Sequence, residues 1–483
     1  MIVVGIGQSK HDGSICAYIN GEIKYRKAER AHGKKHCFAP DYFMYETLRE
    51  WGVSGGDVDL FIQTDSGIFD TGAKTLPYDG EMILSKGTNH LVVDHHMAHV
   101  WSDLSYMGAD QAVVVDGRGS GHHTGLVISA TRPAFRINQF SIGKTMRILM
   151  GFTNNSDDQV GPDAAGKLMG LMSYGTSDPA FYAQYKDVNP AEWIHNLNMM
   201  PPEQRGPEVE SWLNILATCN DLLYSLLYSN YFERTDKSKK IIYSGGCALN
   251  IDWNRRVQDA GYQLSVMPYV YDGGLSIGLV RWGMSLLGEE PFTTMPDFPY
   301  CQDDEAPESL PSTKTIKKVA EELAKGKIVG WYQGHGELGP RALGNRSILM
   351  RPDLVDGKDV INQKVKHREW WRPFGASVKQ DQASKYFDIN DSPYMLLTSK
   401  VLSNDLHSIT HVDGTCRHQT VTPQQNVAYY ELLDEFEKLT GISVLLNTSL
   451  NLGGKPIAGT IKEAKELYAT SGMDALCIGD HLK

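Results

Sequence analysis

The sequence predicts an α/β protein whose functional cleft lies at the ends of its strands. Three runs of β-branched or aromatic residues each pass into glycine plus Asp or Asn: AVVVDGRGSG (112–121), IIYSGGCALN (241–250) and, more loosely, VMPYVYDGGLSIG (266–278). Glycine lets the backbone approach a phosphate closely, and acidic side chains at strand ends can hold cations. Strand, glycine turn and helix recurring in this way are typical of α/β folds that bind ligands at their strand ends.

The first 30 residues predict a β-meander. Strands are expected at 2–7 and 14–20, and an Asn20-Gly21 turn leads into a third at 22–30. The loop between the first two strands, QSKHDG, could present N–H groups to a phosphate or could simply turn the chain. The KKH cluster at 34–36 is interpreted as a solvated loop.

The motif DHHMAH at 94–99 predicts the start of a helix after a short strand at 91–93. Asp94 can cap this helix, and His95 and His99 are four residues apart, so their imidazoles share one face and can share a cation. Packing or capping alone would explain such a pair equally well. Two aspartates at similar strand-end positions, Asp116 and Asp272, favour the metal interpretation. His96 points elsewhere and is interpreted as structural.

The organisation of the chain suggests two folding units. Prolines and acidic residues gather in a predicted linker at 291–312, which leaves domains at 1–290 and 313–483. After the linker, apolar residues at helical spacing from Ile316 to Leu323 predict a helix that Gly326 ends, and KIVGWYQG predicts a strand. A capping box of Thr460 and Glu463 starts a later helix. No internal repeat is visible.

Bulk composition narrows the class of protein. The net charge of −11 argues against a large sequence-independent grip on nucleic acid. The seven cysteines are scattered, without a CxxC pair, which favours a reducing cytoplasm over a disulfide framework or zinc ribbon. No secretory signal and no apolar run near the ~20 residues of a membrane span are found. We therefore expect a cytoplasmic protein without membrane contact.

The C-terminal half concentrates cations near aromatic residues. Arginine presents a planar fork to phosphate or carboxylate oxygens, and lysine supplies a point charge. Such a mixture suits single-stranded nucleic acid as well, but the overall acidity favours a small phosphorylated ligand. The cations are Arg341, Arg346, Arg351, Lys366, Arg368, Arg372 and Arg417. The polar segment NTSLN at 447–451 adds hydroxyl and amide groups.

The chain resembles the O-carbamoyltransferases of the NodU/CmcH family. The matching segments span almost the whole length, and several are long. They are HDGS (11–14), DHHMAH (94–99), VVVDGRG (113–119), GKLMGLMSYG (166–175), SGGCALN (244–250), DGGLSIG (272–278), GPRALGNRSIL (339–349), VKHREWWRPF (365–374), DGTCRHQTV (413–421) and NTSLN (447–451).

The resemblance implies a fold and a two-step chemistry. The N-terminal part is similar to the actin/sugar-kinase (ASKHA) superfamily, with two subdomains, and the C-terminal part to the YrdC-like α/β fold. Carbamoyl phosphate and ATP, with Mg²⁺, would form carbamoyl-adenylate in the C-terminal domain. The carbamoyl group would then move to an acceptor hydroxyl in the N-terminal domain.

The resemblance also implies roles for individual residues. His11 would be the general base of transfer. Adenylate formation would fall to Arg341, Lys366, Arg368 and Ser449. Nucleotide contacts would come from Lys167, Gly245, Gly246, Asn250, Arg346 and Arg417. The metal, for which iron is the family's expectation, would be held by His95, His99, Asp116 and Asp272; zinc or manganese would suit these ligands too.

The sequence departs from the family pattern at two places and leaves the acceptor open. Ser120, followed by His122 and His123, stands where many relatives have an acidic residue, and Asp163-Ala164-Ala165 precedes Gly-Lys where relatives usually have glutamate. The acceptor would be a natural product, a sugar or a hydroxymethylpyrimidine nucleotide or DNA base. Alternative functions are a tRNA threonylcarbamoyl-type transferase or a non-enzymatic nucleotide-dependent switch. The oligomeric state is left open.

Overall fold

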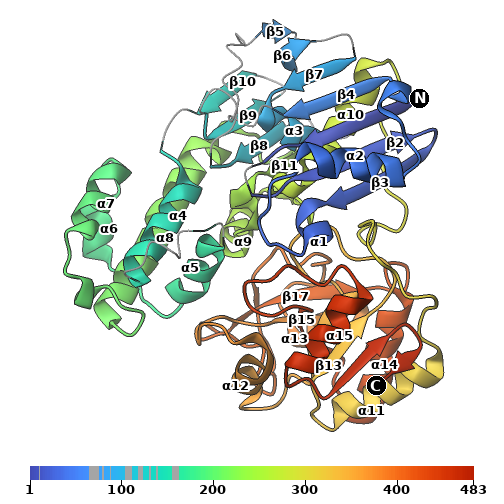
Figure 1. Cartoon of the computed structure of the whole chain (residues 1–483). Coiled ribbons are helices and arrows are strands. Elements are labelled where there is room, and N and C mark those ends of the chain that lie inside the picture. The colour runs from blue at the N-terminus through green and yellow to red at the C-terminus, as the bar shows by residue number, and fades with distance from the viewer. Residues whose placement is uncertain are drawn as a thin grey trace.

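The chain forms two domains that lie one above the other in Figure 1, with a bundle of helices extending to one side of the upper, N-terminal domain. The computed structural model describes residues 1–9, 11–64, 76–78, 81–86, 89–103, 111–117, 123–129, 132–137, 140–154, 161 and 163–483. The departures at Ser120 and His122 lie outside the described residues.

The first sheet of the N-terminal domain begins with the expected meander. Its strand order is β3-β2-β1-β4-β7-β6-β5, with β1, β2 and β3 antiparallel and β1, β4 and β7 parallel. The predicted first and second strands are confirmed, whereas the third ends at Lys27 because a short helix begins at Ala28. The strands are β1 (Ile2–Gly7), β2 (Ser14–Ile19), β3 (Glu22–Lys27), β4 (Leu60–Thr64), β5 (Leu76–Tyr78), β6 (Glu81–Lys86) and β7 (His90–Val93).

The second sheet repeats the topology of the first. Its order is β10-β9-β8-β11-β12, again a meander of three antiparallel strands followed by two parallel ones. The sequence shows no repeat, so this twofold plan is visible only in the tertiary structure. The strands are β8 (Gln111–Val115), β9 (Gly125–Ser129), β10 (Arg132–Ile137), β11 (Lys240–Ser244) and β12 (Gln263–Ser265).

Two helices, α3 (His95–Ser102) and α10 (Leu275–Leu286), lie between the two sheets. They share one apolar core with inward-facing residues of both sheets, such as Val3 and Val114. Gly278 allows the close approach of the two helices, because a Cβ there would lie 2.1 Å from the carbonyl oxygen of Ala98. Both helices begin at the strand ends, so this packing places their first turns side by side.

The remaining helices of the N-terminal domain lie outside the two sheets. The helix α2 packs on the first sheet. The helices from α4 to α9 share one apolar core with the second sheet, and α6 packs on α8 at the end of the bundle far from the sheet. These helices are α1 (Ala28–His32), α2 (Asp41–Glu50), α4 (Ile142–Asn154), α5 (Ala164–Met172), α6 (Pro179–Tyr185), α7 (Pro190–Asn198), α8 (Glu210–Asn230) and α9 (Ile251–Asp259).

The C-terminal domain is built on one mixed sheet with apolar cores on both faces. Its order is β16-β17-β15-β18-β14-β13-β19-β20. The strands are β13 (Val329–Tyr332), β14 (Arg346–Met350), β15 (Gly375–Lys379), β16 (Ser399–Lys400), β17 (Thr415–Val421), β18 (Val444–Ser449), β19 (Ala475–Ile478) and β20 (His481–Leu482). The helices are α11 (Thr313–Ala324), α12 (Gly357–Ile361), α13 (Ala383–Tyr386), α14 (Val427–Thr440) and α15 (Ile461–Thr470).

Several local predictions can be checked against these elements. The helix expected from Ile316 to Leu323 is α11, with Gly326 in the left-handed conformation beyond its end, and Thr460 and Glu463 do form a capping box. The strand expected near 266–271 is wrong. The chain turns at Pro268–Val270 instead, and the next element is a short 3₁₀ helix at Asp272–Gly274. Proline cannot donate a ladder hydrogen bond, so this run is a poor strand.

The segment between the domains, Leu287–Ser312, holds no helix or named strand in the structure. It is nevertheless tied to both domains: Asp303 N donates to Tyr25 O at 2.8 Å, and Glu305 N donates to Gly459 O at 3.1 Å. Among the described residues, none of the helices is both long and apolar enough to span a membrane.

Candidate functional site

Two histidines and two aspartates from distant parts of the chain meet at the strand ends of the N-terminal domain. His95 and His99 come from the first turns of α3, which Asp94 caps by accepting the Met97 N–H at 2.9 Å. Asp116 directly follows β8, and Asp272 opens the 3₁₀ turn before α10. Their ligand atoms all lie within 4.8 Å of one another. The structure thus brings together all four residues expected to bind metal.

The geometry of this cluster suits a cation. His95 Nε2 lies 2.9 Å from Asp116 Oδ2, and His99 Nε2 lies 3.4 Å from Asp272 Oδ1 and 3.6 Å from Asp116 Oδ2. His99 is fully buried, and its Nε2 makes no hydrogen bond within the described part of the chain. A buried imidazole nitrogen aimed at two carboxylates is the donor set of a divalent transition-metal site.

The electrostatics of the cluster are those of a tightly coupled buried group. Burial disfavours every charged form, but the mutual contacts are stronger. The two carboxylates raise the pKa of His95 and His99 above its usual range. The imidazoles in turn hold the pKa of Asp116 well below its usual range and lower that of Asp272, although Asp116 opposes the latter shift. Without a cation, positive imidazoles balance the carboxylates; a bound cation would replace those protons.

His11 stands at the edge of the same cluster. Its Nε2 lies 3.9 Å from Asp272 Oδ2, and its Nδ1 lies 2.7 Å from Asp12 Oδ2. Its side chain is 41% exposed, so a substrate can reach it. Burial lowers the pKa of His11, but the hydrogen bond to Asp12 and the charge of Asp272 produce a net rise. Asp12 orients the ring, as the carboxylate partner of a catalytic histidine does.

His96, between the two expected ligands, has a different environment. It is 1% exposed, and burial lowers its pKa to about 3, so the ring is neutral. It points away from the carboxylate pair, in agreement with its interpretation as structural.

A lysine ammonium already lies between the carboxylates of a second acidic cluster nearby. Asp12, Glu29 and His36 could hold a metal by distance alone. However, Lys27 Nζ lies 3.0 Å from Asp12 Oδ1 and 2.8 Å from Glu29 Oε1, and it also donates to Tyr271 Oη at 2.7 Å. The buried ammonium neutralises the carboxylates itself. This group therefore fixes the loop that carries His11.

The interpretation of 34–36 as a solvated loop is wrong for two of its three residues. Lys35 Nζ lies 2.6 Å from Asp163 Oδ2, and His36 Nε2 lies 3.1 Å from Asp163 Oδ1. Only Lys34 is exposed. The acidic partner lies 128 residues away from Lys35 in the sequence, so local composition could not reveal it. Asp163 is also the first residue of Asp163-Ala164-Ala165, the segment that departs from the family pattern.

The C-terminal domain gathers cations that lack carboxylate partners, of which Lys366 is buried and the three arginines are part-buried. Within the described residues, no ion pair is formed by Arg341, Lys366, Arg368 or Arg417. Burial lowers the pKa of Arg341 and Arg368, and Arg417 and Arg372 lower both further. The pKa of Arg417 falls to about 10 for the same reasons. Mutually repelling buried cations are costly unless an anion binds among them.

Lys366 and Ser449 are held together at this cluster. Lys366 Nζ donates to Ser449 O at 2.8 Å, to Ser449 Oγ at 3.3 Å and to Asn451 Oδ1 at 2.6 Å. Burial lowers the pKa of Lys366 well below its usual range, and Arg368 and Lys35 add to the effect. The NTSLN segment thus positions the ammonium beside the arginines.

Arg346 lies elsewhere in the domain. It is fully buried, stacks 3.7 Å over the Tyr332 ring, and donates to Asp304 Oδ1 at 3.0 Å and to three backbone carbonyls. These contacts tie β14 to the inter-domain segment. The expected contact of Arg346 with a nucleotide stays a prediction.

The expected nucleotide contacts of the N-terminal domain are not gathered in one place. Lys167 pairs with Glu369 of the C-terminal domain at 2.6 Å. Gly246 N donates to Asp116 Oδ1 at 3.3 Å, and Asn250 caps α9 by accepting the Trp253 N–H. Gly245 has a φ of 92°, and a Cβ there would lie 2.3 Å from Val115 O, so the glycine permits the close approach of β11 to β8. Their roles toward a nucleotide remain predictions.

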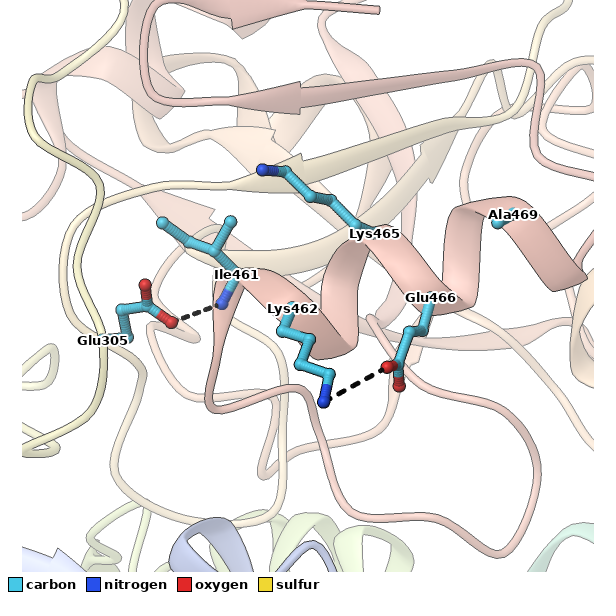
Figure 2. Close-up of a pocket in the computed structure, with 6 residues that line it drawn as sticks. All are labelled: Glu305, Ile461, Lys462, Lys465, Glu466 and Ala469. Atoms are coloured by element: carbon cyan, nitrogen blue, oxygen red, sulfur yellow. Dashed lines mark hydrogen bonds and ion pairs between the residues drawn. The ribbon is translucent and has the colours of Figure 1, made fainter.

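A cavity of about 520 Å³ lies against α15 (Figure 2). Its lining includes Lys462 and Glu466, which lie 3.8 Å apart, and Glu305, which accepts the Ile461 N–H at 2.8 Å. These polar groups satisfy one another, and the cavity contains none of the expected site residues.

Comparison with known families agrees with this architecture. Residues 16–280 match the family described as Carbamoyltransferase N-terminus, and residues 320–483 match Carbamoyltransferase C-terminus. The nodulation protein NolNO of Sinorhizobium fredii is 29% identical over 432 residues, covering 81% of this chain and 63% of its own length. NolO of Bradyrhizobium diazoefficiens is 29% identical, with 81% and 78% covered. A 3'-hydroxymethylcephem-O-carbamoyltransferase of Amycolatopsis lactamdurans is 29% identical, with 65% and 64% covered.

Among solved structures, T. kodakarensis HypF has 15% identity and a TM-score of 0.35, with 61% of this chain and 49% of that chain covered. The component A of the (R)-2-hydroxyglutaryl-CoA dehydratase of Acidaminococcus fermentans has 11% identity and a TM-score of 0.38, with 58% and 96% covered.

The fold is that of a mixed α/β protein, with an N-terminal part built on two sheets and a separate C-terminal domain built on a third. The chain belongs to the carbamoyltransferase family, a family of transferase enzymes.

Proposed function

We propose that the chain is an ATP-dependent O-carbamoyltransferase. In this proposal the C-terminal domain uses water to release inorganic phosphate from carbamoyl phosphate, and the resulting carbamate oxygen attacks the α-phosphate of ATP, with Mg²⁺, to give carbamoyl-adenylate and pyrophosphate. The N-terminal domain then transfers the carbamoyl group to a hydroxyl. The observation that carries the proposal is the group of buried and part-buried cations without carboxylate partners next to the His/Asp cluster. The names of the cephem O-carbamoyltransferase relatives support the same reaction class.

The cation group supports the adenylation step. Carbamoyl phosphate and ATP are both anionic, so a site that joins them must neutralise several negative charges. The charges of Arg372 and Arg417 both lower the pKa of Arg341 and of Arg368, which supports a shared environment for these cations. An anion bound here would offset the repulsion between these cations.

The two sites adjoin across the domain interface. Gly339, two residues before Arg341, comes so close to the N-terminal domain that a Cβ would lie 2.2 Å from Pro268 O. Asp163 and Tyr271, both of the N-terminal domain, act on the charge of Arg341. Tyr271 directly precedes Asp272 of the His/Asp cluster. An intermediate made at the cations would therefore have a short path to His11.

The N-terminal cluster supports the transfer step. His95, His99, Asp116 and Asp272 would hold a divalent cation, for which the family expectation is iron. Such a cation, when bound, acts as a Lewis acid on carbonyl or phosphoryl oxygens. His11 would accept the proton of the acceptor hydroxyl at Nε2, because Asp12 holds its Nδ1. The hydroxyl oxygen then forms the new bond to the carbamoyl carbon, and AMP leaves with the electrons of the broken C–O bond.

The acceptor is proposed as a natural-product, sugar or hydroxymethylpyrimidine hydroxyl. The test supplies purified chain with ATP, carbamoyl phosphate and a panel of these alcohols, and follows pyrophosphate, AMP and carbamoylated product by mass spectrometry. We expect pyrophosphate release without acceptor and a carbamoylated product with one class of alcohol. Absence of pyrophosphate release under all conditions would contradict the proposal and favour a nucleotide-dependent switch. Release that depends on tRNA would favour the threonylcarbamoyl alternative.

A further inference from the structure

Three ligand side chains of the His/Asp cluster have their other polar atom engaged by a group outside the cluster. Ser244 Oγ lies 3.3 Å from His99 Nδ1, Ser9 Oγ donates to Asp272 Oδ2 at 2.6 Å, and Gly246 N donates to Asp116 Oδ1 at 3.3 Å. In each case the remaining atom is the one that faces the cluster. This pattern fixes which atom of each side chain is offered to a cation.

The contact of Ser244 defines the tautomer of His99. Ser244 has a single hydroxyl hydrogen, and it donates this hydrogen to Val270 O at 3.1 Å. Its oxygen can therefore only accept from His99 Nδ1, which must carry the hydrogen. In neutral His99 the lone pair is then on Nε2, which faces Asp116 and Asp272 at 3.6 and 3.4 Å.

The contact of Ser9 orients the carboxylate of Asp272. The Ser9 hydroxyl donates to Oδ2 and accepts the His11 N–H at 3.3 Å. The carboxylate then presents Oδ1 to His95 and His99, at 3.6 and 3.4 Å. Both serines are buried, with 4% exposure for Ser9 and 1% for Ser244, so water cannot easily replace either hydroxyl.

We propose that Ser244 and Ser9 are positioning residues of the cation site. Ser244 holds His99 with Nε2 as the donor atom, and Ser9 orients Asp272 so that Oδ1 faces the two histidines. The site then presents two nitrogens and two oxygens, one from each residue, and leaves further coordination positions to substrate oxygens. The inference rests on the metal site of the proposed function. Outer hydrogen bonds of this kind typically change metal affinity about 10–100-fold.

The experiment titrates Co²⁺ into the full-length chain after chelator treatment, at one pH, and measures the dissociation constant by calorimetry and by visible absorption of the bound ion. The test variants are Ser244→Ala and Ser9→Ala, and the rescue variant is Ser244→Thr, which restores the hydroxyl. The matched control is Ser276→Ala. Ser276 Oγ is buried and bonded to Ser14 Oγ at 2.8 Å, with no hydrogen bond to the four ligands. Thermal melting of each variant verifies that it is folded.

We expect Ser244→Ala and Ser9→Ala each to weaken Co²⁺ binding about 10–100-fold. Ser244→Thr and Ser276→Ala should stay within about threefold of the parent chain, since the ligand contacts are intact. If folded Ser244→Ala and Ser9→Ala bind Co²⁺ as the parent does while His99→Ala does not, the metal site stands and the positioning role is overturned. If the parent chain binds no Co²⁺, both the metal site and the positioning role of the serines are contradicted. If the parent chain transfers no carbamoyl group but the two serine-to-alanine variants bind Co²⁺ more weakly than it does, the proposed function is contradicted and the positioning role is supported.

Discussion

Lys167 Nζ of α5 lies 2.6 Å from Glu369 Oε1 of the C-terminal domain, and this ion pair joins the two domains. Beside it, Trp371 Nε1 donates to Lys167 O at 3.2 Å, and Gly170 packs against Pro373. Glu369 also lies 3.4 Å from Arg372, so it touches the cation group as well. The helix α5 is thus a direct contact between the transfer domain and the cations.

Glu369→Gln should loosen this contact without removing any residue proposed to act on the substrate. A partly buried ion pair contributes up to about 1 kcal/mol, so we expect a two- to fivefold fall, roughly, in carbamoylated product per AMP released. Pyrophosphate release should be retained. Lys438→Gln breaks an exposed pair with Asp434 and should change neither quantity. An unchanged product ratio in Glu369→Gln would show that the ion pair does not couple the sites.

The two domains should separate the two half-reactions. Arg341→Ala or Lys366→Ala should abolish adenylate formation, measured as pyrophosphate exchange into ATP, by about 100-fold or more, because each removes a charge that stabilises the reacting anions. His11→Ala should spare the exchange and slow carbamoyl transfer by about 10²–10⁴. Equal loss of both steps in all three variants would rule out separate sites.

Gly278→Ala should disturb the cation site from a distance. A Cβ at Gly278 would lie 2.1 Å from Ala98 O and 2.7 Å from Ser102 N, so α3 must move away from α10. We expect a loss of about 1–3 kcal/mol in the free energy of unfolding in urea, together with weaker Co²⁺ binding. Gly166→Ala on α5 meets no described atom within 4 Å and serves as the control. Unchanged stability of Gly278→Ala would contradict the close packing.

Stability should depend on pH through His36. Burial lowers its pKa, but hydrogen bonds to Asp12 and Asp163 outweigh this effect and raise the pKa to about 9. Since the unfolded value is about 6.5, protonation favours the folded chain. The contribution, about 1–3 kcal/mol, is complete below pH ~6.5 and is lost as the pH rises through ~9.

The variant His36→Asn measures this contribution, because asparagine tolerates the positive φ of 53° at this position. Its deficit in melting temperature relative to the parent should be largest near pH 6 and should vanish above pH ~9. A deficit that grows toward high pH would mean that the assigned ionisation is wrong.

Much of the fold could be predicted from local patterns. The hairpin at Asn20-Gly21, the cap at Asp94 and the capping box at Thr460 each depend on a few adjacent residues, and each was found where expected. The run at 266–271 was predicted wrongly, because apolar residues suggested a strand and the turn at Pro268 prevailed. The sequence predicts a solvated loop at Lys35 and His36. The structure differs because Asp163, whose carboxylate pairs with both side chains, lies far along the chain.

The sequence by itself determined the donor chemistry of this protein: which histidines share a helix face, which aspartates accompany glycine turns, and which segments carry arginine. Only the tertiary structure decided how those groups are placed. It set Asp116 and Asp272 beside His95 and His99, placed Ser9 and Ser244 against two of these ligands, and paired Arg346 with Asp304. The physical reason is that charge, burial and hydrogen-bond partnership depend on neighbours in space, which two packed sheets and a domain interface bring together.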